Sequence, residues 1–289
     1  MLVSSSEPRR RLERSADVSK KSVLVLGHTG MLGSTVAKYL AASGHDVVTT
    51  PVRFGPMLAI RPLLMPTSVD VVVNCIGAIP QRGPTPLEML ELNGLLPHAL
   101  RHIFPASTLL IHASTDCVFS GHQGCYAEND PPDATDDYGV SKAFGDKVEL
   151  YDNTVVLRTS IIGPAATPHG LMQWLLGQPR GATVKGYTRA RWNGVTTLEW
   201  AKVADEVIVG WEPHGIGVVC HVASAGALTK YSLLMRIAEL WRPDLSIEKA
   251  DLPNPPRDMR LVAVGPYARR PIEAQLIELR SWMLDGAHK

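Results

Sequence analysis

The chain has 289 residues, of which 45% are hydrophobic and 20% charged, with 29 Lys and Arg against 28 Asp and Glu. This composition is typical of a globular enzyme and excludes a disordered or fibrous chain. The formal charge of +1 excludes a strongly electrostatic nucleic-acid binder, so no nucleic-acid partner is expected. The length allows one large domain or two lobes that share a core.

The four cysteines show neither a zinc nor a redox spacing. Cys75, Cys117, Cys125 and Cys220 contain no Cys-x-x-Cys pair, and the ten histidines form no His-Glu-x-x-His pattern. We therefore expect reduced thiols, a cytoplasmic location and no bound metal. No apolar run approaches the roughly 18 residues of a membrane span, which predicts no membrane partner. Residues 1–21 are rich in Ser and Arg and predict a flexible extension.

Short apolar runs alternate with helical periodicity from Ser22 onward. Strands that are apolar on both faces and separated by helices indicate parallel crossovers. The sequence therefore predicts an α/β fold with a Rossmann-type doubly wound parallel sheet. The expected strands cover residues 22–27, 45–50, 70–75, 108–112 and 154–157, and the expected helices cover residues 31–42, 87–102 and 137–150.

The alternation weakens after Ser160. Helical patterns at 171–176, 198–209 and 230–241 and an apolar run at 217–222 are separated by stretches rich in Gly and Pro. We expect two units. A dinucleotide-binding Rossmann domain with the catalytic residues covers 22–163, and a smaller interleaved substrate-binding lobe covers most of 164–289. Segments near 195–224 are expected to return to the Rossmann domain.

A glycine-rich loop, Gly27-His-Thr-Gly30-Met-Leu-Gly33, lies between the first predicted strand and helix. A dinucleotide pyrophosphate needs a tight turn, a backbone approach without a Cβ atom and the free N–H groups of a helix N-terminus. The alternative is a turn that only packs. We expect the following loop residues to bind a cofactor: Gly27, Thr29, Gly30, Met31, Leu32 and Gly33.

The end of the second predicted strand distinguishes the two nicotinamide cofactors. NAD-binding sites have an acidic side chain about 20 residues after the loop, at the ribose 2′-hydroxyl. The stretch Val47–Pro51 has no carboxylate, and Arg53 follows it. A guanidinium there can pair with a 2′-phosphate, which favours NADPH over NADH. The alternative is that Arg53 is a solvated loop charge.

Three residues predict acid–base chemistry beside that cofactor. Thr115 follows the strand at 108–112, and Tyr138 and Lys142 are four residues apart on a predicted helix. Positions i and i+4 share one helix face, so the phenol and the ammonium can both face the cleft. A nearby ammonium is expected to lower the pKa of the Tyr138 phenol, and the Thr115 hydroxyl to polarise a substrate carbonyl.

At this point the sequence resembles the extended short-chain dehydrogenase/reductase family over nearly all of residues 22–285. Within it, the sequence is most similar to the branch of dTDP-4-dehydrorhamnose reductases and related nucleotide-sugar reductases. The similar segments are Val71–Gly77, Glu91–Asn93, Ser114–Gly121, Tyr126–Asp130, Tyr138–Lys142 and Leu157–Ser160.

The resemblance implies an NAD(P)-dependent oxidoreductase that reduces the 4-keto group of a nucleotide-linked 4-keto-6-deoxy sugar, in deoxysugar or polysaccharide biosynthesis. Thr115, Tyr138 and Lys142 would be the catalytic residues, and Asn93 a structural or relay residue behind them. Homodimerisation is a further expectation. The remaining implied contacts are Cys75, Ile76, Gly77, Tyr138 and Lys142 for the cofactor, and Ser114, Thr115, Asp116, Cys117 and Val118 for the substrate.

The nucleotide end of the substrate is expected to meet the less regular C-terminal half. Arg191 and Trp192, with Lys185 and Arg189 nearby, offer cations for a diphosphate and a ring for a base or sugar. A solvated basic loop is the alternative for these residues. The sequence also departs from the branch at Ile161, where its members usually have Trp near the sugar.

Three other functions remain open. Epimerase-reductases that resemble GDP-fucose synthase pair a Cys two positions after the catalytic Thr with a later His, for which Cys117 and His169 are candidates. A 4,6-dehydratase is disfavoured, because those enzymes have Glu where this chain has Cys117. Some members of the branch are regulatory subunits that bind dinucleotide without catalysis, although such a module has no need of the catalytic residues.

Overall fold

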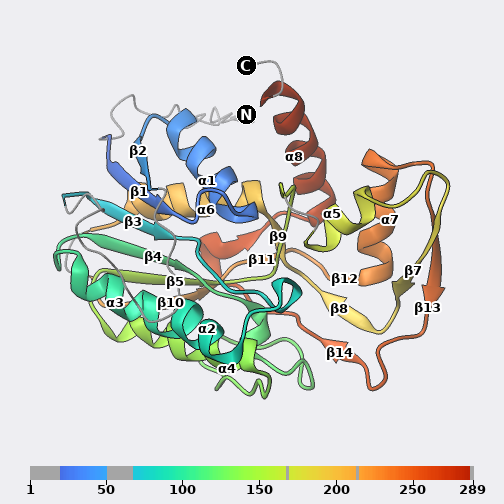
Figure 1. Ribbon diagram of the computed structural model, residues 1–289, viewed down its shortest axis with the longest axis horizontal. Coiled ribbons are helices and arrows are strands. Elements are labelled where there is room, and N and C mark those ends of the chain that lie inside the picture. Colours follow the sequence, from blue (N-terminus) through green and yellow to red (C-terminus); the bar gives the residue numbers. More distant parts are fainter. Residues whose placement is uncertain (1–19, 51–67, 167–168, 213–214, 287–289) are drawn as a thin grey trace, which may run out of the picture.

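The computed structural model describes residues 20–50, 68–166, 169–212 and 215–286. Six parallel strands form its main sheet, in the order β10-β5-β4-β3-β1-β2 (Figure 1). The α/β class expected from the sequence is confirmed. The strands are β1 (Ser22–Leu26), β2 (Asp46–Thr49), β3 (Val71–Asn74), β4 (Leu109–Ala113), β5 (Thr154–Arg158) and β10 (Val218–His221).

Helices cover both faces of this sheet. Successive strand residues point to opposite sides, so Val23 of β1 packs with helices α1 (Met31–Ala42) and α6 (Thr197–Gly210), whereas Leu24 packs with α3 (Leu96–Ile103). The strand order reverses at β1, which lies between β2 and β3. Ligands of such sheets bind at this switch point, beyond the carboxyl ends of the strands.

The helix expected over 87–102 is not regular. The chain forms α2 (Pro86–Met89), then a π-helix (Leu90–Leu95), and then α3. A capping box between Thr85 and Glu88 starts the segment. A π-turn inserts an extra residue and changes which side chains face inward, and such turns are frequent at functional sites.

The smaller lobe packs around its own core of apolar side chains. Its helix α8 and strand β13 were not predicted from the sequence, and β13 falls in the Pro-rich stretch 243–256. The helices of this lobe are α5 (Leu171–Leu176), α7 (Lys230–Trp241) and α8 (Ile272–Gly286). Its paired strands are β7 (Thr183–Tyr187) with β13 (Ser246–Ala250), β8 (Ala190–Trp192) with β12 (Leu228–Thr229) and β14 (Arg257–Asp258), and β11 (Ala223–Ser224) with β15 (Ala268–Arg269), while β6 (Ile161–Ile162) pairs with β9 (Val195–Thr196).

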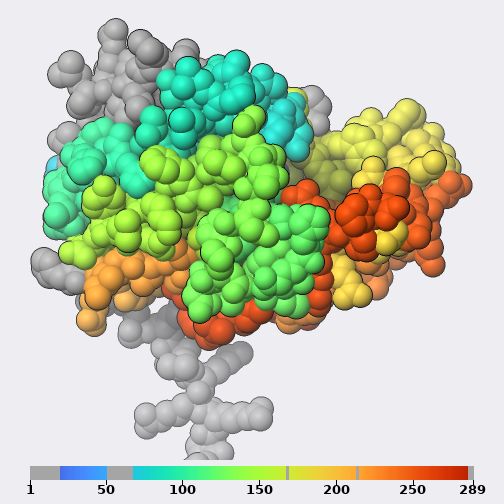
Figure 2. Space-filling model, turned by 90° about the horizontal axis from the view of Figure 1, so that it is seen from below, coloured from blue at the N-terminus to red at the C-terminus, as the bar shows by residue number. Residues whose placement is uncertain are grey.

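Segments from the C-terminal half lie beside the larger sheet. Within 195–224, α6 packs on α1, and β10 pairs with β5 at the sheet edge. The backbone near β14 also contacts the loop after β4, since Asp258 N donates to Gly121 O at 2.8 Å. Figure 2 shows, from below, the green part of the chain lying against orange-red C-terminal segments. The exact domain boundaries stay a prediction.

Candidate active site

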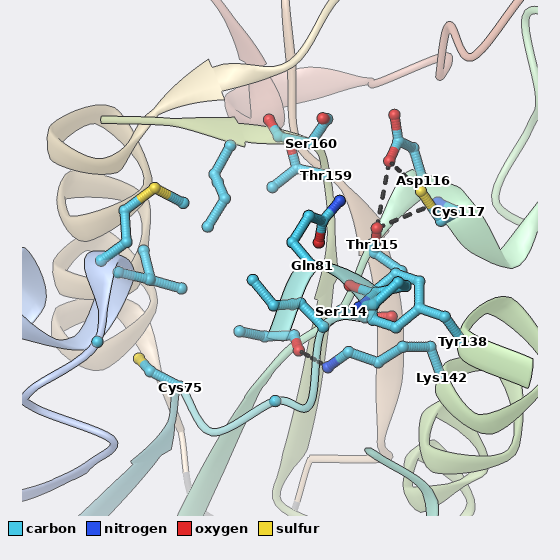
Figure 3. A pocket seen from close by; sticks show the side chains of 18 of the residues that line it. Cys75, Gln81, Ser114, Thr115, Asp116, Cys117, Tyr138, Lys142, Thr159 and Ser160 are labelled. Carbon is cyan, nitrogen blue, oxygen red and sulfur yellow. Dashed lines mark hydrogen bonds between the residues drawn. The ribbon is translucent and has the colours of Figure 1, made fainter. Parts of the chain in front are cut away.

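A cavity of about 620 Å³ lies at the switch point, where the expected site residues gather (Figure 3). The residues on its wall that the sequence predicted are Gly30, Met31, Leu32, Cys75, Ile76, Gly77, Ser114, Thr115, Asp116, Cys117, Tyr138 and Lys142. Those that it did not predict are Ile79, Pro80, Gln81, Arg82, Ala113, Asp136, Thr159, Ser160, Trp200 and Arg257, while Ile161, whose position the resemblance places near the sugar, also lies on the wall. Residues 79–82 continue the loop after β3 that carries the predicted residues Cys75 to Gly77, and this continuity along the sequence could have identified them.

The glycine loop has the shape needed for a phosphate group. Gly27 has a φ of +77°, which favours glycine, and a Cβ atom on Gly33 would lie 2.3 Å from Gly27 O. Gly30 caps α1 without any side-chain hydrogen bond, and the first turn of α1 has no acidic residue. The first N–H groups and the positive end of this 12-residue helix are therefore available to an anion.

Asn93 in the π-helix holds the loop after β3 beside helix α4 (Asp137–Asp146). Its amide accepts from Ala78 N at 2.8 Å and donates to Ala78 O at 2.9 Å and Ser141 Oγ at 3.1 Å. A Cβ atom on Gly77 would lie 3.4 Å from Asn93 Oδ1 and 3.7 Å from Lys142 Nζ. The fully buried Asn93 therefore fixes the loop after β3, which adjoins the glycine loop at Cys75 and Ile76.

Local geometry also sets the position of Tyr138. Asp136 caps α4 by accepting a hydrogen bond from Gly139 N at 3.0 Å. A Cβ atom on Gly139 would lie only 2.4 Å from Cys117 O, so the glycine lets α4 approach the backbone after β4. This close approach brings the Tyr138 side chain beside Thr115 in the cavity (Figure 3).

The expectation that Lys142 lowers the pKa of the Tyr138 phenol is wrong. Lys142 Nζ donates to Ala113 O at 2.8 Å. Burial, followed by the nearby Cys117 thiol, raises the pKa of the Tyr138 phenol above its usual value, and hydrogen bonding from Thr115 acts in the opposite direction. The phenol is therefore neutral at physiological pH, the state in which it can donate a proton.

The pKa of Lys142 shifts in the opposite direction from that of Tyr138. Burial lowers the pKa of its ammonium to about 8, against the attraction of Asp146 one turn further along α4. If the ammonium contacts a bound dinucleotide, affinity should fall as the pH rises above about 8, by at most about tenfold per unit for one proton. Fluorescence titration with NADPH at pH 7–10 measures this. Lys142→Arg keeps the charge and should flatten the profile, whereas a flat wild-type profile would contradict the contact.

Several predicted site residues lie away from the cavity wall. Arg191 is exposed, and Trp192 is only 2% exposed within the core of the smaller lobe, so its ring does not face the cavity. Val118 is fully buried beneath the wall. Arg53 lies outside the described residues. Gly27, Thr29 and Gly33 shape the loop behind Gly30 and do not line the cavity.

Cys117 lines the cavity, but His169 does not belong to the described residues of its wall. Burial, followed by the charge of Asp116, raises the pKa of the Cys117 thiol to about 12. In the part of the chain that the structure describes, no three His, Cys, Asp or Glu side chains are grouped as metal ligands. None of the helices in these ranges is long and apolar enough to cross a membrane.

Comparison with known proteins gives a family and relatives. Residues 23–165 match the sequence model of the NAD dependent epimerase/dehydratase family. A probable low-salt glycan biosynthesis reductase of Haloferax volcanii is 29% identical over 266 residues, 80% of this chain and 85% of that protein. Methionine adenosyltransferase 2 subunit beta of Mus musculus is 28% identical over 169 residues, 52% of this chain and about half (50%) of its own length.

The fold has a counterpart among solved structures. The crystal structure of dTDP-4-dehydrorhamnose reductase from Bacillus anthracis, in complex with NADP, superimposes with a TM-score of 0.74. The match covers 92% of this chain and 99% of that chain, at 14% sequence identity. This likeness concerns the arrangement of the strands and helices.

Proposed function

Because the chain belongs, through residues 23–165, to the NAD-dependent epimerase/dehydratase family and is thus an NAD(P)-dependent oxidoreductase, we propose that it reduces the 4-keto group of a nucleotide-linked 4-keto-6-deoxy sugar. One observation carries the proposal: a single cavity brings Thr115, Tyr138 and Lys142 to the uncapped N-terminus of α1. The Haloferax volcanii relative, named as a glycan biosynthesis reductase, and the dTDP-4-dehydrorhamnose reductase fold support the substrate class.

The glycine loop fits a dinucleotide. A pyrophosphate placed at Gly30 would accept hydrogen bonds from the first N–H groups of α1, and the space that Gly27 and Gly33 leave free allows the backbone to come close. Cys75, Ile76 and Gly77 would contact the nucleosides, and Lys142 a ribose hydroxyl. When bound, the nicotinamide supplies the hydride.

Tyr138 then acts as the general acid. Its neutral phenol donates a proton to the alkoxide that forms at the carbonyl oxygen, and its raised pKa keeps that proton available through the neutral range. Thr115, whose Oγ1 accepts from Cys117 N at 3.1 Å and donates to Asp116 Oδ1 at 3.2 Å, would redirect its hydroxyl hydrogen to hold the same oxygen in place. Catalysis by these residues consists of positioning and proton transfer, since the reducing power comes from the cofactor.

The proposed function is tested with purified protein, NADPH and a panel of 4-keto-6-deoxy sugars linked to dTDP, UDP, GDP or CDP. NADPH oxidation followed at 340 nm should require one of these sugars, and the product should carry a hydroxyl at C4. Binding of NADPH without turnover of any sugar in the panel would favour a regulatory subunit, the second candidate. That candidate is supported by the similarity to methionine adenosyltransferase 2 subunit beta.

The preference for NADPH rests on the absence of a carboxylate after β2 and on Arg53. We expect NADPH to bind more tightly than NADH, and Arg53→Ala to narrow the difference, because a guanidinium that pairs with the 2′-phosphate has no partner in NADH. Fluorescence titration of both cofactors on both proteins measures the ratio. Equal wild-type affinities, or an unchanged ratio in the variant, would contradict this preference.

We favour simple reduction over epimerisation of a carbon beside the ketone. A thiol with a pKa of about 12 stays protonated in the neutral range and so does not accept the proton of the sugar carbon, and His169 is absent from the described part of the cavity wall. Turnover in deuterated water distinguishes the two reactions. Deuterium at C3 or C5 of the sugar that disappears in Cys117→Ser would support epimerisation, and a product without ring deuterium supports simple reduction.

A further inference from the structure

Ser141 connects two parts of the candidate site that lie on different elements. Its Oγ donates to the backbone carbonyl of Tyr138 at 2.9 Å and accepts from Asn93 Nδ2 at 3.1 Å. Asn93 also bonds both backbone polar groups of Ala78, which directly follows the expected cofactor contact Gly77. An unbroken chain of hydrogen bonds therefore runs from the loop after β3 to the residue that donates the proton in the proposed function.

The direction of each bond in this chain is fixed, because every side-chain hydrogen in it is used. A serine hydroxyl has one hydrogen, and Ser141 gives it to Tyr138 O. A side-chain amide has two, and Asn93 gives one to Ala78 O and the other to Ser141 Oγ. Rotation of either side chain would leave a buried polar group unpaired, which costs free energy. Directional contacts therefore set the position of Ala78 relative to Tyr138.

Close packing of the π-helix (Leu90–Leu95) on α4 leaves little room for movement around Ser141. A Cβ atom on Gly145 would overlap Asn93 O, and one on Gly94 would lie 3.3 Å from Ser141 O. The two glycines let the backbones meet at the level of this serine. A π-turn changes which side chains face inward, and here it leaves Asn93 facing α4.

Helix α4 does not itself need a hydroxyl at this position. Ser141 is the fifth residue of α4, and serine is a poorer helix former than alanine because its side chain competes for backbone hydrogen bonds. The residue is only 3% exposed, so alanine there would bury no side-chain polar atom. The carbonyl of Tyr138 has a regular helical partner, the N–H four residues further on. What the hydroxyl adds is the bond to Asn93.

We propose that Ser141 is a positioning residue that sets the place of the Tyr138 phenol relative to the cofactor loop. The inference rests on the proposed function, in which Tyr138 donates the proton and Gly77 contacts the cofactor. A displacement of about 1 Å within an active site can cost about 100-fold in rate. Loss of the Ser141 hydroxyl should therefore slow proton transfer while the cofactor stays bound, since Asn93 still holds Ala78.

The position of Tyr138 is tested first without any sugar. The protein is labelled with ¹³C at tyrosine Cζ and saturated with NADPH, and the Tyr138 signal is assigned with Tyr138→Phe. This signal should move or broaden in Ser141→Ala and in Ser141→Cys, which keeps the volume but forms weak hydrogen bonds. Ser281→Ala is the matched control, because Ser281 donates to Ile277 O of its own helix at 3.2 Å but is exposed on α8. An unchanged Tyr138 signal in both Ser141 variants overturns the proposal.

The effect on catalysis is tested with the sugar that the panel identifies. Ser141→Ala and Ser141→Cys should lower the single-turnover rate of NADPH oxidation by at least about tenfold and raise its solvent deuterium isotope effect, because proton transfer becomes slower. The Kd of NADPH should change by less than about twofold, and Ser281→Ala should change neither quantity. A wild-type rate in Ser141→Cys, or a loss of NADPH affinity as large as the loss of rate, overturns the positioning role.

The route through Asn93 is tested by combining substitutions. In Asn93→Ala the serine has lost its donor, so adding Ser141→Ala should lower the single-turnover rate by at most about twofold more. The same loss with and without the Asn93 amide overturns this route. If wild type reduces no sugar, the proposed function fails, while the NMR comparison still decides whether Ser141 positions Tyr138.

Discussion

Tyr138→Phe is expected to lower kcat by about 10²- to 10⁴-fold while NADPH affinity is retained. The substitution removes the phenol that donates the proton and keeps the ring that packs against the cavity wall, so the loss falls on chemistry. General acid catalysis typically contributes a factor of this size. Stopped-flow measurement of NADPH oxidation under single-turnover conditions separates this step from product release.

The control for this variant is Tyr187→Phe. Tyr187 lies in β7, is 45% exposed and is away from the cavity. Tyr187→Phe removes the same hydroxyl group and should leave kcat unchanged. The direction of the Tyr138 pKa shift adds a second readout, since a raised pKa predicts that reduction does not decline through titration of the phenol between pH 6 and 9. Wild-type activity of Tyr138→Phe on the identified sugar would exclude the phenol as the proton donor.

Gly33→Ala is expected to weaken NADPH binding by at least about tenfold, or 1.4 kcal/mol, and to lower the free energy of unfolding by about 1–3 kcal/mol. The new Cβ atom would lie 2.3 Å from Gly27 O and 2.6 Å from Gly27 C, which are backbone atoms of the turn. Helix α1 must then move away from the glycine loop. Denaturant unfolding and fluorescence titration with NADPH measure the two effects.

Gly210→Ala is the matched control for this variant. Gly210 ends α6, and a Cβ atom there would meet no other atom within 4 Å. The same substitution should therefore stabilise the protein slightly, by about 0.4–1 kcal/mol, because alanine restricts the unfolded chain. If Gly33→Ala binds NADPH as tightly as Gly210→Ala does, the close approach of α1 to the glycine turn is not needed for the cofactor.

Local sequence pattern was sufficient wherever neighbouring residues decide the structure. The predicted helix at 31–42 coincides with α1, and the predicted strands lie within one or two residues of β1 to β5, because apolar spacing and the turn at Gly27 act over a few residues. The spacing of Tyr138 and Lys142 was likewise enough to place both on one face of α4. The irregular helix at Leu90–Leu95 escaped prediction, since it depends on packing against α4.

The sequence by itself determined the α/β fold class, the glycine loop and the group of Thr115, Tyr138 and Lys142, since each follows from local periodicity and spacing. Only the tertiary structure decided which distant residues join them. Pairing of β8 with β14 brings Arg257 to the cavity, while burial takes Trp192 away from it and raises the pKa of Tyr138. Burial and the pairing of separate strands depend on residues that lie far apart in the sequence, such as Ala190 and Arg257, and local spacing along the chain does not predict them.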